Sequence, residues 1–264
     1  MLTTRTHEKR EMTTSTSKET DSGVISQIER DGFATLPDVF DPVEVDAITT
    51  ELTQALVIGR PGVLEQAGRI YAARNILQLW PKVADVWRRP PLPEILREVL
   101  GPDFGLVRVL FFDKPPEQSW SLPWHKDLTI AVRNNRLPSR QFEHPTTKSG
   151  VPHVEASQAV LEGMLTARIH LDDVTEENGP MKVIPGSHLT GKVSSIDESK
   201  CRTVLAQRGD VLLIRPLVEH NSVPSRSGSL QHRRILHLEF ANSPDLPDGY
   251  EWHDYVPGCT PPNS

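Results

Sequence analysis

The chain has 264 residues, a formal net charge of −6 and a pI near 5.9. This acidic balance argues against a nucleic acid or an anionic membrane surface as the main partner, because both attract basic proteins. Two cysteines are too few for a disulfide framework or a cysteine-rich zinc site, and no run of about 18 apolar residues could cross a membrane. We therefore expect a cytoplasmic protein.

The residue pattern divides the chain into a tail and one domain. Residues 1–23 are rich in Thr, Ser, Glu and Lys, which predicts a disordered tail. The single domain over 24–264 is expected to hold a helical part at 24–101, a strand-rich core at 102–240 and a C-terminal extension at 241–264.

Two helices are marked by their ends. Asp41 and Glu44 form a capping box, with Pro42 at the first helical position and apolar residues following at helical spacing. Pro93 begins a second, shorter helix, which Gly101 ends.

Short apolar runs separated by turn residues follow, and they predict strands. The expected strands are Val107–Phe112, Thr129–Val132, Leu165–Leu171, Met181–Ile184, Val211–Ile214 and Ile235–Phe240. Helices followed by many strands indicate an α+β fold, with the helices packed on one side of an antiparallel sandwich or small barrel.

Residues 133–162 show no clear periodicity. Connections of this length are uncommon in compact domains and often close over a binding site. We therefore expect this segment to act as a lid, with a solvated surface loop as the alternative.

The chemistry must come from histidine and carboxylate, because the glycine-rich nucleotide motifs and the serine-hydrolase motif are missing. Three His-x-carboxylate triplets begin at His125, His170 and His237. Strand periodicity places both members of a triplet on one face, where they could bind one metal ion or simply form a solvated pair. Only the first triplet, His125 and Asp127, has a well-placed third ligand, in His220.

The order of several motifs resembles the phytanoyl-CoA dioxygenase family of Fe(II)/2-oxoglutarate oxygenases. The matching pieces are Phe111-Phe112-Asp113-Lys114-Pro115-Pro116, Trp124-His125-Lys126-Asp127, Asn178-Gly179-Pro180 with Pro185-Gly186-Ser187-His188, and Gly209-Asp210-Val211 through His220-Asn221-Ser222 to Arg233. The resemblance implies a double-stranded β-helix (jelly-roll, cupin-like) core with the N-terminal helices on one sheet.

The resemblance also implies a site. Fe(II) would bind His125, Asp127 and His220, which are the catalytic residues, and would leave positions open for 2-oxoglutarate and O2. The far carboxylate of 2-oxoglutarate needs a guanidinium. Alternation along the last strand gives this role to Arg233 and leaves Arg234 on the outer, ion-paired or solvated face.

Further residues are expected around this centre. Ser222 matches a family position that helps to hold the 2-oxoglutarate carboxylate, and Lys114 and Thr129 are further candidates for cofactor binding. Arg74, Asn75 and His153 are candidates for the substrate opening.

Three outcomes remain open at this stage. The leading one is hydroxylation of a C–H bond in a small molecule, with release of succinate and CO2. The same cofactors could instead support desaturation, epimerisation or ring formation, because the outcome depends on where the substrate lies. A jelly roll that binds a metal or small molecule without turnover is the third. Neither the substrate nor the oligomeric state follows from the residues.

Overall fold

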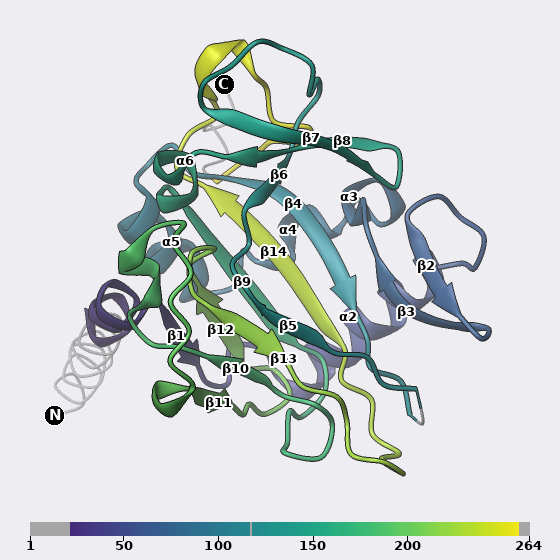
Figure 1. The fold of residues 1–264 in the computed structure, drawn as a ribbon. Helices are drawn as coiled ribbons and strands as arrows, with labels where there is room; N and C mark the ends of the chain where they lie inside the picture. Colours follow the sequence, from purple (N-terminus) through teal and green to yellow (C-terminus); the bar gives the residue numbers. More distant parts are fainter. Residues whose placement is uncertain (1–21, 117, 259–264) are drawn as a thin grey trace, which may run out of the picture.

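The structure, a computed structural model, describes residues 22–116 and 118–258. Its main feature is a large antiparallel sheet that forms the back wall of the molecule (Figure 1). The strands run in the order β1 (Phe33–Leu36), β12 (Val211–Ile214), β9 (Met164–His170), β14 (Ile235–Ala241), β4 (Gly105–Phe112), β3 (Arg69–Ala73) and β2 (Val63–Gln66), while β15 (Val256–Pro257) pairs with β4.

A second antiparallel sheet lies in front of the first. Its order is β11 (Arg202–Val204), β10 (Met181–Val183), β13 (His220–Ser222) and β5 (Leu122–His125). The two sheets form the jelly-roll core that the sequence predicts. A third sheet, in the order β6 (Thr129–Ala131), β8 (Val151–Ala156) and β7 (Phe142–Lys148), closes one end of the core.

The helices pack mainly on the back of the large sheet. Residues 22–31 are helical, and the named helices are α2 (Pro42–Ala55), α3 (Ile76–Leu79), α4 (Val83–Val86), α5 (Leu92–Leu100) and α6 (Gln158–Glu162). Short 3-10 turns follow at η1 (Ser187–Thr190), η2 (Glu198–Lys200) and η3 (Pro247–Gly249). The expected capping box is present, since the Asp41 carboxylate accepts from the Glu44 backbone N–H and Glu44 accepts from that of Asp41.

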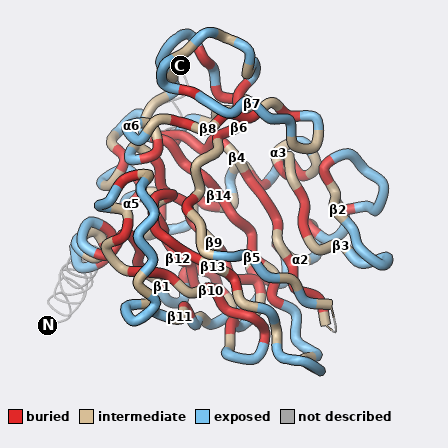
Figure 2. Tube along the Cα trace, viewed as in Figure 1, coloured by how far each residue is buried: buried red, intermediate tan, exposed pale blue. Residues whose placement is uncertain are grey.

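The largest apolar cluster joins residues of these helices to residues of the large sheet, whose central strands are mostly buried (Figure 2). Ile48 and Leu52 from α2 belong to the same cluster as Leu236, Leu238 and Phe240 from β14. The prediction that the N-terminal helices lie on one sheet is therefore confirmed.

Two regional predictions were wrong in detail. Residues 24–101 are not helical throughout, because β1, β2 and β3 lie within them; β1 is a short apolar run whose state is decided by pairing with β12. Residues 133–162 are not an irregular loop, because they include the β7–β8 hairpin and α6. The strand β7 has an almost wholly exposed surface, so its sequence lacks the alternation of a half-buried strand.

Some predictions lie outside the described residues. The expected tail over 1–23 does so except for its last two residues, which belong to the first helix. The division into one domain with a C-terminal extension stays a prediction. No helix within the described ranges is long and apolar enough to cross a membrane.

Candidate active site

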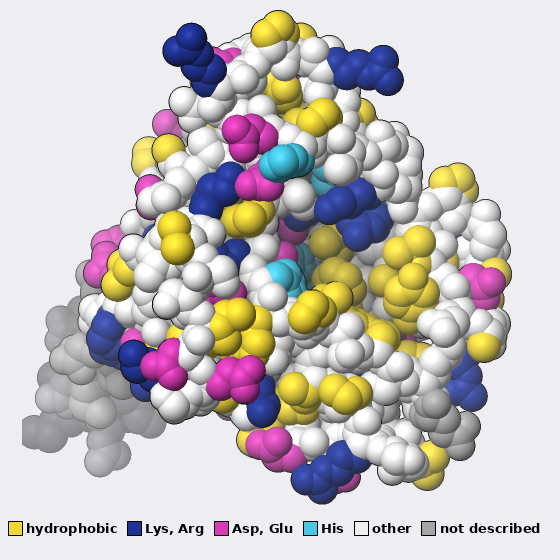
Figure 3. All heavy atoms as spheres, viewed as in Figure 1, with side chains coloured by type: hydrophobic (Ala, Val, Ile, Leu, Met, Phe, Trp, Pro, Cys, Tyr) yellow, Lys and Arg dark blue, Asp and Glu magenta, His cyan; other side chains and the backbone are white. Residues whose placement is uncertain are grey.

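A cavity of about 450 Å3 opens between the large sheet and the front sheet. Figure 3 shows it as a hollow with histidine and basic side chains at its rim. Its walls carry charged groups and apolar ones in nearly equal number. The lining residues are Leu64, Tyr71, Ala72, Arg74, Arg108, Leu110, Phe112, Trp120, Leu122, His125, Asp127, Thr129, Lys148, Arg168, Met181, His220, Ser222, His237 and Glu239.

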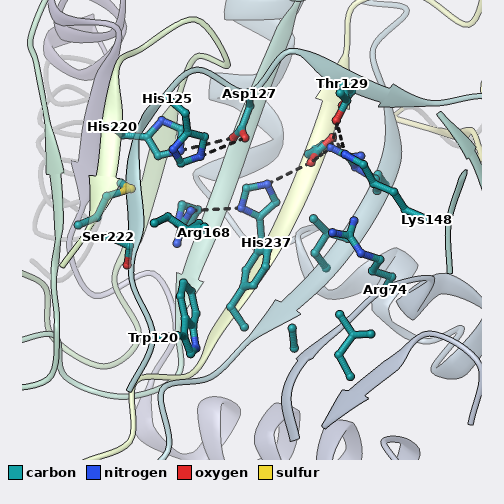
Figure 4. Close-up of a pocket in the computed structure, with 18 of the residues that line it drawn as sticks. Arg74, Trp120, His125, Asp127, Thr129, Lys148, Arg168, His220, Ser222 and His237 are labelled. Atoms are coloured by element: carbon teal, nitrogen blue, oxygen red, sulfur yellow. Dashed lines mark hydrogen bonds and ion pairs between the residues drawn. The ribbon is translucent and has the colours of Figure 1, made fainter. Parts of the chain in front are cut away.

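Three side chains meet on the front wall of this cavity. His125 ends β5 and His220 begins β13, and the two residues face each other in the antiparallel register of these strands. Asp127 lies two residues past β5, and its two carboxylate oxygens are 3.8 Å from His125 Nε2 and 3.7 Å from His220 Nε2. One candidate ligand atom from each residue lies within 4.8 Å of the others (Figure 4).

Backbone contacts orient both imidazoles. The Nδ1 atom of His125 lies 2.8 Å from the Pro123 carbonyl oxygen, and that of His220 lies 2.9 Å from the Val218 carbonyl oxygen. Since a carbonyl oxygen only accepts, Nδ1 is the protonated nitrogen of each ring in these contacts. Each Nε2 lone pair is thus left free toward Asp127, as a metal ligand requires.

The protonation states at neutral pH also suit a metal. Burial lowers the pKa of His220 to about 4, so its ring is neutral. Burial opposes ionisation of Asp127, but the nearby His220, His237 and His125 rings outweigh it and lower the Asp127 pKa to about 2. A neutral imidazole and an ionised carboxylate are the forms that bind a divalent cation. The three residues therefore fit the predicted iron site.

A largely buried chain of hydrogen bonds forms the floor behind these candidate ligands. The Arg168 guanidinium lies 3.4 Å from His237 Nδ1, and His237 Nε2 lies 3.2 Å from a Glu239 oxygen. Arg108 then donates two hydrogen bonds to Glu239, at 2.5 and 2.8 Å. Strand register explains the order, because β14 lies between β9 and β4 and pairs His237 with Arg168 and Glu239 with Arg108.

This chain of hydrogen bonds was not expected from the sequence. A signal existed, because Arg168 and Arg108 are the single arginines of largely apolar strands, and His237 and Glu239 share one face of β14. This signal does not decide whether the arginines enter a site, since a lone arginine at the edge of a strand that faces solvent gives the same local pattern.

The two adjacent arginines before β14 have opposite environments. Arg233 is 1% exposed, and its guanidinium donates to Ser222 Oγ at 3.3 Å. Its Nε has no hydrogen-bond partner among the described residues, and burial together with the charge of Arg168 lowers its pKa to about 9. Arg234 instead forms two side-chain hydrogen bonds to Asp172, at 2.6 and 2.8 Å.

Arg233 itself is not on the wall of the main cavity, whereas its partner Ser222 is. Arg168 lines both the cavity and a small gap of about 10 Å3 that Arg233 also lines. The unpartnered buried Nε of Arg233 suits an anionic ligand at this end of the cavity. Its role in holding 2-oxoglutarate stays a prediction.

The other two residues expected to bind the cofactor, Thr129 and Lys114, lie in different environments. Thr129 lines the cavity, where its hydroxyl accepts from the Lys148 ammonium at 3.0 Å. Lys114 is fully buried away from that wall and donates to the carbonyl oxygens of Gly179 and Val223. Burial, with the charges of Arg233 and Arg168, lowers its pKa to about 6.

Of the expected substrate residues, only Arg74 lines the main cavity. Asn75 and His153 line a much smaller neighbouring gap, which Arg74 also borders. His153 is buried, with Nδ1 2.9 Å from the Val151 carbonyl oxygen. Asn75 donates its side-chain amide to the Ser149 carbonyl oxygen at 3.2 Å.

His170, from the second triplet, takes no part in the metal cluster. It is buried, and its Nδ1 lies 3.2 Å from the Asp210 carbonyl oxygen. Its triplet partner Asp172 is paired with Arg234 instead. These contacts give His170 a structural role.

The family model for "Phytanoyl-CoA dioxygenase (PhyH)" matches residues 28–235. The chain belongs to the phytanoyl-CoA dioxygenase family. Among curated relatives, an ectoine dioxygenase from Bordetella parapertussis is 26% identical over 171 residues, which cover 62% of this chain and 48% of the relative. An L-proline trans-4-hydroxylase from Streptomyces griseoviridis is 26% identical over 166 residues, covering 62% and 54%. The chain spans about half the length of these relatives.

Solved structures agree with this family fold. The enzyme EctD from S. alaskensis, crystallised with 2-oxoglutarate and 5-hydroxyectoine, has a TM-score of 0.62 at 19% identity, over 82% of this chain and 74% of EctD. The epimerase SnoN, in complex with Fe3+, α-ketoglutarate and nogalamycin RO, has a TM-score of 0.63 at 17% identity, over 88% of each chain. The jelly-roll prediction is confirmed.

Proposed function

We propose that this protein is an Fe(II)- and 2-oxoglutarate-dependent dioxygenase that hydroxylates a C–H bond of a small molecule. The observation that carries the proposal is the cluster of His125, Asp127 and His220 on the wall of a cavity. Two imidazoles and one carboxylate on one side of an ion leave positions free for a chelating 2-oxoacid and for O2, whereas structural zinc is fully enclosed by protein ligands.

Within this proposal the far carboxylate of 2-oxoglutarate lies against Ser222 and Arg233, with Arg168 beside them. Arg168 and Ser222 line that end of the cavity, Arg233 donates to Ser222 from behind the wall, and within the described ranges no carboxylate lies within 4.0 Å of either guanidinium. Bound iron would supply the oxidising chemistry, with 2-oxoglutarate and O2 consumed and succinate and CO2 released.

The protein's own groups would keep this centre in order. The carbonyl oxygens of Pro123 and Val218 hold the two histidine rings in one tautomer. The Arg168–His237–Glu239–Arg108 chain makes the floor rigid and neutralises Glu239, so that its charge does not compete for the ion. The cytoplasmic location and the lid role of residues 133–162 stay predictions.

The test measures metal binding and turnover in three variants. Iron titration should show that Asp127→Ala and His220→Ala each lose the binding of one Fe(II) per chain. Both variants should also lose 2-oxoglutarate-dependent succinate release. His170→Ala is the matched control, because it removes a buried histidine outside the cluster, and it should retain the metal. Loss of metal in His170→Ala with retention in Asp127→Ala would contradict the proposed site.

A substrate screen tests the activity itself. The wild-type protein, loaded with Fe(II) and 2-oxoglutarate, is offered a small-molecule library, and succinate release is compared with the substrate-free rate. A hit whose product gains one oxygen atom supports hydroxylation. A product with one C=C bond more or an inverted centre would assign desaturation or epimerisation instead. Metal binding without any 2-oxoglutarate consumption would favour the non-catalytic alternative.

A further inference from the structure

The charges on the cavity wall do not balance. Four basic residues line it, namely Arg74, Arg108, Lys148 and Arg168, against two acidic ones, Asp127 and Glu239. Glu239 is already satisfied by Arg108 and His237, and Asp127 faces the two histidines of the metal cluster. Arg168 belongs to the end of the cavity assigned above to 2-oxoglutarate. Two cations on the wall, Arg74 and Lys148, therefore have no role assigned so far.

These two cations lack an acidic partner. Over residues 22–116 and 118–258, no carboxylate oxygen lies within 4.0 Å of the Arg74 guanidinium or the Lys148 ammonium. Lys148 donates to the Thr129 hydroxyl, and no side-chain hydrogen bond of Arg74 is formed with the described part of the chain. Both side chains are half-buried, so solvent screens their charges only in part.

The two cations repel each other, and the fold nevertheless holds them together. Burial lowers the pKa of Lys148 most, and the charges of Arg108 and Arg74 lower it further. Figure 4 shows both side chains on the same side of the cavity, across His237 from the metal cluster. They come from separate elements, since Arg74 follows β3 and Lys148 ends β7.

One hydrogen bond ties these elements together. Asn75 donates to the carbonyl oxygen of Ser149, which directly follows Lys148. Asn75 has a left-handed backbone with φ of 58°, a conformation that asparagine tolerates better than most residues do. This contact gives Asn75 a positioning role toward the pair.

The neighbouring wall is apolar. Leu64, Ala72 and Phe112 line it from β2, β3 and β4, next to the strand end that carries Arg74. A ligand that suits this part of the cavity combines an apolar body with a negatively charged end.

We propose that Arg74 and Lys148 bind an oxyanion on the substrate, of the carboxylate, phosphate or sulfate class, and thereby set its distance from the metal. This inference rests on the proposed function, because the second ligand of the cavity is the molecule to be oxidised. The anion would neutralise both cations and accept charge-assisted hydrogen bonds from them, while the apolar wall holds the rest of the molecule. The pair then selects substrates by charge.

The test uses three fluorinated probes that differ in charge: 4-fluorophenylacetate, its neutral amide, and 4-fluorophenyl phosphate. Their affinities are measured by ligand-observed 19F NMR on the full chain, loaded with Zn(II) and saturating 2-oxoglutarate so that the co-substrate site is filled. At least one anionic probe should bind more tightly than the amide. Arg74→Gln and Lys148→Gln should each weaken that binding by about tenfold, the scale of a lost charge-assisted contact, and leave the amide unchanged.

Three further variants sharpen this test. Arg136→Gln removes an exposed arginine outside the cavity and should change nothing. Asn75→Gly keeps the left-handed backbone but removes the side-chain amide of Asn75. It should weaken binding of the anionic probe and leave binding of the neutral probe unchanged. Arg233→Ala should leave anion binding intact, because Arg233 is assigned to the co-substrate.

The outcomes separate the inference from the proposed function. Preference for the acetate or for the phosphate probe identifies the anion class and supports the pair in either case. Equal binding of anion and amide, no effect of the two Gln variants, or loss only in Arg233→Ala would overturn it. The same comparison of probe affinities without 2-oxoglutarate tests anion binding by Arg74 and Lys148 even if the protein proves not to consume that co-substrate.

Discussion

The two faces of the large sheet show how one set of strands builds both a core and a site. Toward the helices, Leu236, Leu238 and Phe240 of β14 lie in one apolar cluster with the residues of α2 and α5. Toward the cavity, the alternate residues His237 and Glu239 contact each other, and each contacts an arginine of a neighbouring strand. A shift of one residue in strand register would exchange these faces.

The comparison shows which face has its side chains fully partnered within the protein. On the helix face, apolar side chains are buried against one another, and no group is left to bind a ligand. The cavity face carries more basic than acidic side chains, and both its half-buried Arg168 and the buried Arg233 behind it lack carboxylate partners within the described part of the chain. Buried cations without acids are costly unless a ligand completes them. Substitutions on the two faces should therefore have different effects.

The largest expected effect separates the two adjacent arginines. Arg233→Ala should weaken 2-oxoglutarate binding by two or more orders of magnitude, because a buried charge-assisted pair that loses one partner costs about 3–5 kcal/mol. Arg234→Ala should change it by less than about tenfold, since Arg234 is committed to Asp172. Isothermal titration of both variants with 2-oxoglutarate measures the difference.

Arg168→Gln is the informative companion variant for this pair. A larger loss in Arg168→Gln than in Arg233→Ala would move the anchor to β9, the strand that lines the cavity directly. A larger loss in Arg234→Ala would contradict the assignment of the faces altogether.

The next effect contrasts stability on the two faces. Leu238 is fully buried against the helices, so Leu238→Ala should lower the free energy of unfolding by about 2–5 kcal/mol. Leu64 is half-buried on the cavity wall, where truncation only enlarges an existing space, so Leu64→Ala should cost less than about 1.5 kcal/mol. Urea unfolding of both variants checks this, and equal losses would mean that the cavity wall is packed as tightly as the core.

The smallest expected effect is a pH dependence at Asp172. Burial of Asp172 disfavours its charged form, but hydrogen bonds and charge from Arg234 outweigh burial and lower its pKa. A carboxylate with a lowered folded-state pKa adds stability above its unfolded pKa of about 3.9 and loses it as the pH falls through the folded value. The melting temperature of the wild type should therefore exceed that of Asp172→Asn at pH 7.

The same gap should narrow as the pH falls below about 4, where the unfolded chain takes up the proton first. Melting curves of both proteins across the acid range test this. A gap that stays constant from pH 7 to the acid limit would mean that the pair contributes through packing and not through charge.

Local patterns carried much of this structure. The i, i+2 spacing of His125 and Asp127, the alternation of β14 and the capping box at Asp41 follow from strand and helix geometry, so they could be read from neighbouring residues. His220 was the third ligand that both the strand pattern and the family motifs predicted, and the structure brings it beside the other two.

Only the tertiary structure decided the rest of the site. The chain from Arg168 to Arg108 exists because β14 lies between β9 and β4. Lys148 lies on the same side of the cavity as Arg74 because the β7–β8 hairpin is joined to the segment after β3 through Asn75 and Ser149. These contacts join residues far apart in the chain, and no local periodicity encodes which strands pair or in which register. The sequence by itself therefore determined the candidate metal ligands and the faces of single strands, while strand pairing decided which charges share the cavity.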